Sequence, residues 1–198
     1  MRNVHLFILF SVLTCIFMAG CVHKQYDLSS IEGYFESHKS NLQEIASAAK
    51  KNLSEERPYI GYDYDEFVLY SKEQDGPVTL NEKDKIFGTL IQLLKKEERC
   101  IGVEVQGDMV VILLDNNDFI LFDDKATDKI QNPFQSSIKG PWEKKVANNQ
   151  VTFISDHRKE KETEWRGMYY QVDVKIVEEG VFACHLTTRY PWYSNLIG

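Results

Sequence analysis

Three consecutive predicted strands near the middle of the chain constrain the fold more than any other feature. Residues 100–106 (CIGVEVQ), 109–114 (MVVILL) and 119–122 (FILF) are largely apolar runs, and the short links between them are rich in Gly, Asn and Asp. Such links are typical of antiparallel hairpins. The run 109–114 contains no polar residue, so we expect a central strand that is covered on both faces.

Two amphipathic helices are predicted to supply part of that cover. The first begins at the capping-box pattern of residues 29–32 (SSIE) and ends before Arg57-Pro58, because the residue ahead of a proline disfavours the helical region. Steps of three and four indicate one buried stripe, made of Ile31, Tyr34, Phe35, His38, Leu42, Ile45, Ala49 and Leu53. A second capping-box pattern, residues 79–82 (TLNE), predicts a helix through Glu98 that buries Ile86, Phe87, Leu90, Ile91 and Leu94.

Further strand patterns flank this region. They cover residues 66–71, 151–155, 168–177 and 181–188, and Tyr170, Val172, Val174 and Ile176 alternate onto one face. The stretch 123–150 contains two prolines and is predicted to be irregular. We therefore expect a single α+β domain over residues 29–198, in which two amphipathic helices pack on a mostly antiparallel sheet of six or seven strands.

The first 21 residues have the pattern of an export signal. Arg2 precedes an uncharged apolar run over residues 6–17, and the run leads into Met18-Ala19-Gly20-Cys21. The run fits the roughly 7–15 residues of a signal peptide's apolar core and is shorter than the ~20 needed to cross a bilayer as a helix.

Residues 18–21 resemble the lipobox of bacterial lipoproteins, in which an apolar residue and two small residues precede a cysteine; Met18 stands where leucine is usual. The resemblance implies a signal peptide over residues 1–20, acylation of Cys21 as the first mature residue, and a lipidated tether over residues 21–28. The following residue is Val22 rather than the Asp that retains enteric-type lipoproteins at the inner membrane. This implies a cell-envelope protein on the outer membrane, facing the periplasm, if the source is Gram-negative. An uncleaved anchor helix and an ordinary soluble export signal are the alternatives.

The charge of the chain restricts its partners. Residues 1–20 hold Arg2 and no acid, so the mature chain has 22 Lys and Arg against 30 Asp and Glu, a formal charge of −8. Nucleic-acid binders present basic patches, so no nucleic-acid partner is expected.

Two cysteines remain after export and lipidation, because Cys15 leaves with the leader and Cys21 is acylated. Cys100 and Cys184 therefore form an even pair in an oxidising compartment. They are candidates for one disulfide, and the alternative is two buried free thiols.

The sequence contains no recognisable catalytic, metal or cofactor motif. It has no H-E-x-x-H, C-x-x-C or G-x-S-x-G pattern. The loop 115–118 (DNND) continues with Ile120 and Ala126 where an EF-hand needs Gly and Glu. Neighbours in a strand point to opposite faces, so Cys184 and His185 are not expected to meet. These observations favour a protein that is not an enzyme.

Aromatic and acidic residues gather in two segments that are candidates for binding a partner. They are Tyr59, Tyr62, Asp63, Tyr64 and Asp65 in one segment, and Tyr190, Trp192 and Tyr193 in the other. Tyr and Trp are frequent anchors of protein interfaces. The alternative is that these rings pack over the edges of the core.

The sequence thus favours a membrane-anchored, non-enzymatic protein-binding module, held by its acyl chains and acting as an immunity-type inhibitor or as an assembly or scaffold factor. The competing hypothesis is an envelope hydrolase that acts on peptidoglycan or glycans. The hydrolase predicts a deep cleft that holds either two acids facing each other or a Cys–His pair. Asp63, Asp65 and Glu66 are the residues that would have to meet such a partner.

Overall fold

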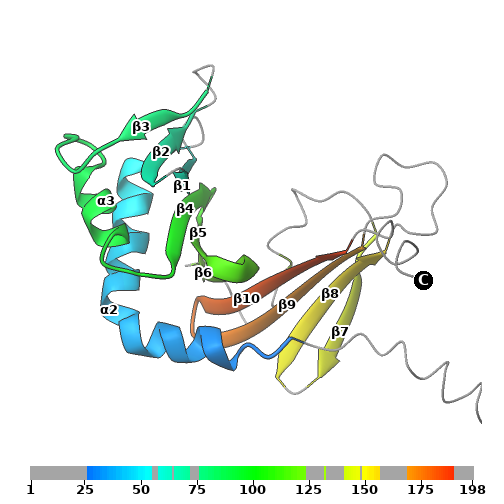
Figure 1. The fold of residues 1–198 in the computed structure, drawn as a ribbon. Coiled ribbons are helices and arrows are strands. Elements are labelled where there is room, and N and C mark those ends of the chain that lie inside the picture. The colour runs from blue at the N-terminus through cyan, green and yellow to red at the C-terminus, as the bar shows by residue number, and fades with distance from the viewer. Residues whose placement is uncertain are drawn as a thin grey trace, which may run out of the picture.

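Ten strands form one continuous sheet with two helices on one of its faces, within the residues that the computed structural model describes (Figure 1). These are residues 26–54, 58–63, 65–71, 76–123, 132, 141–147, 149–156 and 169–189. The predicted leader and Cys21 lie outside them.

The elements have the following bounds. The helices are α2 (Ser29–Asn52), α3 (Gly88–Leu94) and the 3-10 turn η1 (Asp115–Asn117). The strands are β1 (Tyr59–Asp63), β2 (Glu66–Tyr70), β3 (Val78–Leu80), β4 (Cys100–Gln106), β5 (Met109–Leu114), β6 (Asp118–Asp123), β7 (Glu143–Ala147), β8 (Gln150–Asp156), β9 (Tyr169–Glu178) and β10 (Val181–Arg189). Neighbours in the sheet follow the order β3-β2-β1-β4-β5-β6-β10-β9-β8-β7 and pair antiparallel.

Helix α2 buries most of the stripe that its periodicity predicts, but Tyr34 is only half-buried and His38 is exposed. Its buried side chains are Ile31, Phe35, Leu42, Ile45, Ala46 and Ala49. The predicted capping box does not form: the Ser29 N–H donates to Asp27 Oδ1 at 3.0 Å, and Glu32 pairs with Lys175. Among the described residues, no helix is both long enough and apolar enough to cross a membrane.

Strand β5 is buried on both faces, as its unbroken apolar run predicts. Val110, Ile112 and Leu114 belong to the cluster that includes α2 and α3. Val111, between them, belongs to a second cluster with side chains of β6, β8, β9 and β10. Because successive side chains of a strand alternate, the sheet has a helix face, which contacts α2, and an outer face on the other side.

The predicted sheet of six or seven strands is wrong, because the sheet has ten. The additional strands are β1, β3 and β7. β3 and β7 are the edges, and all five side chains of β7 are exposed. A strand of this kind is defined by backbone hydrogen bonds to its neighbour and not by buried side chains, so it leaves no apolar alternation in the sequence.

The second predicted helix is also wrong in extent, because α3 covers only Gly88–Leu94. Upstream, Val78–Leu80 pairs with β2 as a strand. The side chain of Asp84 then accepts the backbone N–H groups of Ile86 and Phe87, each at 2.9 Å. Such local bonds favour turns over helix. Ile86 is consequently 54% exposed instead of buried.

The two isoleucines of this region provide a matched test. We expect Ile91→Ala to lower the free energy of unfolding by about 2–5 kcal/mol, because Ile91 is fully buried. Ile86→Ala removes the same atoms from an exposed position and is expected to cost less than about 1 kcal/mol. Urea denaturation of both variants checks this, and equal losses would contradict the structure.

Candidate functional site

The aromatic residues predicted to bind a partner lie on the β1–β2 hairpin. Tyr59 is half-buried and stacks on Tyr70, with ring centroids 5.1 Å apart. Its ring also lies over Gly61, where an added Cβ would come within 2.8 Å of three ring or hydroxyl atoms of Tyr59. Tyr62 is 48% exposed and packs against Phe67. Tyr59 therefore mainly covers the sheet, whereas about half of the Tyr62 surface remains accessible to a partner.

The acids of this hairpin lie around its turn. Asp63 pairs across the turn with Glu66, and both flank Asp65 at the exposed end of the hairpin. Asp65 has φ = 68°, in the left-handed region. Tyr64, Tyr190, Trp192 and Tyr193 lie outside the described residues.

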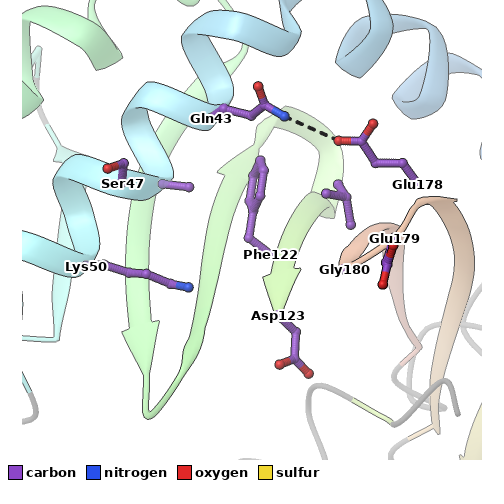
Figure 2. A pocket seen from close by; sticks show the side chains of 10 residues that line it. Gln43, Ser47, Lys50, Phe122, Asp123, Glu178, Glu179 and Gly180 are labelled. Atoms are coloured by element: carbon purple, nitrogen blue, oxygen red, sulfur yellow. Dashed lines mark hydrogen bonds between the residues drawn. The ribbon is translucent and has the colours of Figure 1, made fainter. Parts of the chain in front are cut away.

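A pocket of about 570 Å³ lies between α2, the end of β6 and the β9–β10 turn (Figure 2). Its floor consists of the buried side chains of Ala46, Phe122 and Val181. Its rim consists of polar residues from three elements, and Figure 2 shows the Phe122 ring between them. These rim residues are Gln43, Ser47, Lys50, Asp123, Glu178 and Glu179.

The β9–β10 turn fixes one wall of this pocket. Gly180 has φ = 72°, and its carbonyl accepts the N–H of Asp123 at 2.8 Å. A Cβ at Gly180 would lie 3.0 Å from the Asp123 carbonyl oxygen. Glycine is therefore required both for the backbone conformation and for the close approach of the turn to β6.

The pocket rim is predominantly acidic. Glu178 is tied to α2, because it pairs with Lys39 and accepts the Gln43 amide at 3.3 Å. The hydrogen bond from Lys39 to Glu178 raises the pKa of the lysine. Glu179 is exposed and has no ion pair within the described part of the chain. Three carboxylates and one amine, that of Lys50, line the pocket.

A second polar group lies on the helix face beyond the start of α2. Asp118, which is buried, accepts Arg99 at 2.9 Å and faces His185 Nδ1 at 2.7 Å. Arg99 also bonds Asp115 at 2.7 Å. The ring of Tyr26 stacks on the imidazole, with centroids 3.5 Å apart and planes within 6°. Burial is the main cause that raises the pKa of the Tyr26 hydroxyl.

A neighbouring set of hydrogen bonds, centred on Asp173, holds the first described residue of the chain. The Tyr26 N–H donates to Asp173 Oδ2 at 3.2 Å, and the Tyr26 carbonyl accepts the Gln150 amide at 3.0 Å. Asp173 in turn accepts Thr152 at 2.5 Å and Gln171 at 2.7 Å. These bonds satisfy polar groups that would be costly to bury alone. We assign these bonds and the Asp118–His185 pair a structural role, because Tyr26 is bonded to Asp173 and its ring covers the face of the His185 imidazole.

A third polar group joins α2 to the segment that follows α3. The buried Glu97 accepts Tyr34 and Asn41, each at 2.6 Å, and pairs with His38 at 2.8 Å. Burial, followed by the bond to Glu97, raises the pKa of Tyr34. Tyr34 packs against the core as its spacing predicts and also donates to the buried carboxylate, whereas His38 is exposed and pairs with that carboxylate instead of joining the apolar stripe.

The structure does not bring Cys100 and Cys184 together. Both are free and buried, and they belong to the clusters on opposite faces of the sheet. Burial raises the pKa of Cys100 to about 12 and also raises that of Cys184. Their positions fit the alternative of two buried thiols. His185 faces Asp118 on the helix face, so Cys184 and His185 point apart, as predicted.

Sequence reasoning did not identify the pocket. Glu178, Glu179 and Gly180 indicate a turn, and Asp123 reads as a loop acid, but their approach to α2 depends on the fold. No group of three or more His, Cys, Asp or Glu that could hold a metal occurs among the residues described. No family model, curated protein or solved structure matches this chain.

The state of the thiols can be tested by alkylation. We expect Cys100 and Cys184 to resist iodoacetamide at mildly alkaline pH in the folded protein, because burial and raised pKa values keep both as inaccessible thiols. Unfolding in guanidinium without a reductant should let both react, as measured by mass spectrometry of their peptides. Two cysteines that react only after reduction would instead indicate a disulfide.

The role of Asp173 can be tested by hydrogen exchange. Asp173→Ala removes the acceptor of the Tyr26 N–H, of the Thr152 hydroxyl and of the Gln171 amide. We expect faster amide exchange at Tyr26 and a loss of about 1–3 kcal/mol in the free energy of unfolding. Glu98→Ala, at an exposed acid, is the control. Unchanged exchange at Tyr26 would show that the network does not hold this segment.

Proposed function

We propose that this protein is a lipid-anchored, non-enzymatic module of the cell envelope that binds a basic segment of another protein. The pocket between α2 and the β9–β10 turn carries the proposal. It combines an apolar floor with a rim of carboxylates. The lipobox resemblance of residues 18–21 supports the anchor and the envelope location.

The chemistry of the pocket suits an arginine or lysine side chain. Both have an apolar stem that packs on hydrophobic surface and a cationic head that seeks carboxylates. The stem would lie on Phe122 and Val181, and the head would meet Glu179 and Asp123. Arginine anchors seated in pockets are frequent hot spots of protein interfaces.

The charge of the whole chain favours the same class of partner. The mature chain has a formal charge of −8. A net negative field accelerates the encounter with a basic protein and slows the encounter with an acidic one. An immunity-type inhibitor of a basic toxin and an assembly factor with a basic client both fit this description.

The competing hydrolase hypothesis has less support. Asp63, Asp65 and Glu66 lie at an exposed hairpin end and do not line the pocket. Glu178, the acid of the pocket that projects toward α2, is already paired with Lys39 and Gln43. The hairpin acids therefore do not face the acids of the pocket, and Glu178 is held by its partners on α2, whereas glycosidase chemistry requires two acids that face each other across a cleft.

A charge-reversal pair tests the binding proposal. The unmodified protein, Glu179→Lys and Glu98→Lys are each used to capture proteins from envelope extracts. The affinity of Glu179→Lys for a basic partner should fall by at least about tenfold, because like charges brought together at an interface cost several kcal/mol. Glu98→Lys makes the same charge change at an exposed acid outside the pocket lining and should retain the partner.

The salt dependence of capture adds a second measurement. Exposed charge pairs are screened by salt, so the partner of the unmodified protein should elute as ionic strength rises. If the Glu179→Lys and Glu98→Lys proteins capture the same proteins at every salt concentration, the pocket is not the binding site.

A further inference from the structure

The place where the tether joins the fold determines which surface can approach the membrane. Tyr26 is bonded to Gln150 and Asp173, and Gln150 is the first residue of β8, next to the β7–β8 turn. Figure 1 shows the start of α2 beside β8 and β9 at the end where that turn lies. The chain therefore enters the domain alongside the β7–β8 turn.

The distance from the proposed anchor to this point is short. Five residue steps separate Cys21 from Tyr26, and five residues span at most roughly 17 Å when fully extended. If Cys21 carries acyl chains, its backbone is held at the headgroup layer. The β7–β8 end of the sheet then cannot move far from the lipid surface.

The side chains at this end are unusually exposed for their type. Val146 on β7 is 70% exposed, the largest value among the exposed large hydrophobic residues of the described chain, and Ile176 on β9 is 44% exposed. Val146 pairs with Val151, which pairs with Val174, so Val146 and Ile176 both lie on the outer face. They lie two strands apart and are offset by two residues along the strands, which places them roughly 12 Å apart.

The charges of β7 differ from those of the chain as a whole. β7 carries Lys144 and Lys145, which are exposed, and Glu143, which lies 3.5 Å from the Lys145 amine. Lys144 lies over the Phe153 ring, and on the helix face Lys175 is paired with Glu32. Asp27 lies beside the tether, Asp173 accepts the Tyr26 N–H, and Glu178 and Glu179 follow Ile176 at this end of the sheet. β7 is thus net positive within a strongly acidic protein.

We infer that the β7–β8 end, defined by Val146, Ile176, Lys144 and Lys145, is the surface that rests on the bilayer. Val146 and Ile176 enter the headgroup region, and the lysines meet phospholipid phosphates. Lysines close to an anionic membrane each favour binding, and the acyl chains provide the main attachment. This inference rests on the lipid anchor of the proposed function and adds the face by which the domain contacts the membrane.

Site-directed fluorescence tests the orientation. The full chain, lipidated at Cys21, is placed in vesicles of phosphatidylethanolamine and phosphatidylglycerol after labelling Val146→Cys with an environment-sensitive NBD probe. Ile86→Cys is the matched control, because Ile86 is also an exposed aliphatic residue and precedes α3 at the far side of the fold (Figure 1). The unsubstituted chain reports any labelling of Cys100 and Cys184.

The inference expects a blue shift of the probe at position 146 and a loss of its emission to lipid-borne quenchers, with neither change at position 86. A probe at position 146 that stays in water, in protein that floats with the vesicles, would overturn the membrane-facing surface and leave the anchor intact. Protein that does not float would contradict the anchor itself and this inference with it.

Discussion

The burial of β5 on both faces is the constraint on which the rest of the structure depends. An apolar strand with no wet side needs cover from two directions. α2 and α3 supply it on the helix face, through side chains such as Phe35, Leu42 and Ile91. On the outer face the cover comes from apolar side chains of β6, β8, β9 and β10 that cluster around Val111. The long sheet thus provides a second core on its own outer face.

The helix face changes character where α2 no longer covers it. Under α2 the buried side chains of β5 and β6 are apolar, whereas next to the segment that precedes α2 the strands β8, β9 and β10 carry Thr152, Asp173 and His185. These side chains are buried, and each makes a hydrogen bond that offsets the cost of burying it. Tyr26 covers these side chains, because its ring stacks on His185 and its N–H donates to Asp173. The same bonds therefore complete the fold and fix the point at which the amino-terminal segment leaves it.

The two proposed surfaces lie at different parts of α2. The segment before the helix joins the β7–β8 end, and the pocket lies along its second half, from Gln43 to Lys50. At 1.5 Å per residue, the rise from Ser29, where α2 begins, to Gln43 is roughly 21 Å. The other wall of the pocket begins at Glu178, two residues after Ile176 on β9, so the pocket borders the end that rests on lipid and a protein bound there would lie close to the lipid surface.

Local patterns in the sequence determined α2, β4, β5 and the β9–β10 hairpin, because periodic apolar residues and turn-forming residues act over a few neighbours. They also separated Cys184 from His185, since alternation in a strand is local. Only the tertiary structure decided the edge strands β3 and β7, the short extent of α3, the free thiols on opposite faces and the pocket at Gly180. Each of these depends on a partner distant in the chain, such as β2 for Val78–Leu80 or α2 for Glu178, and no local pattern encodes which distant segment will arrive.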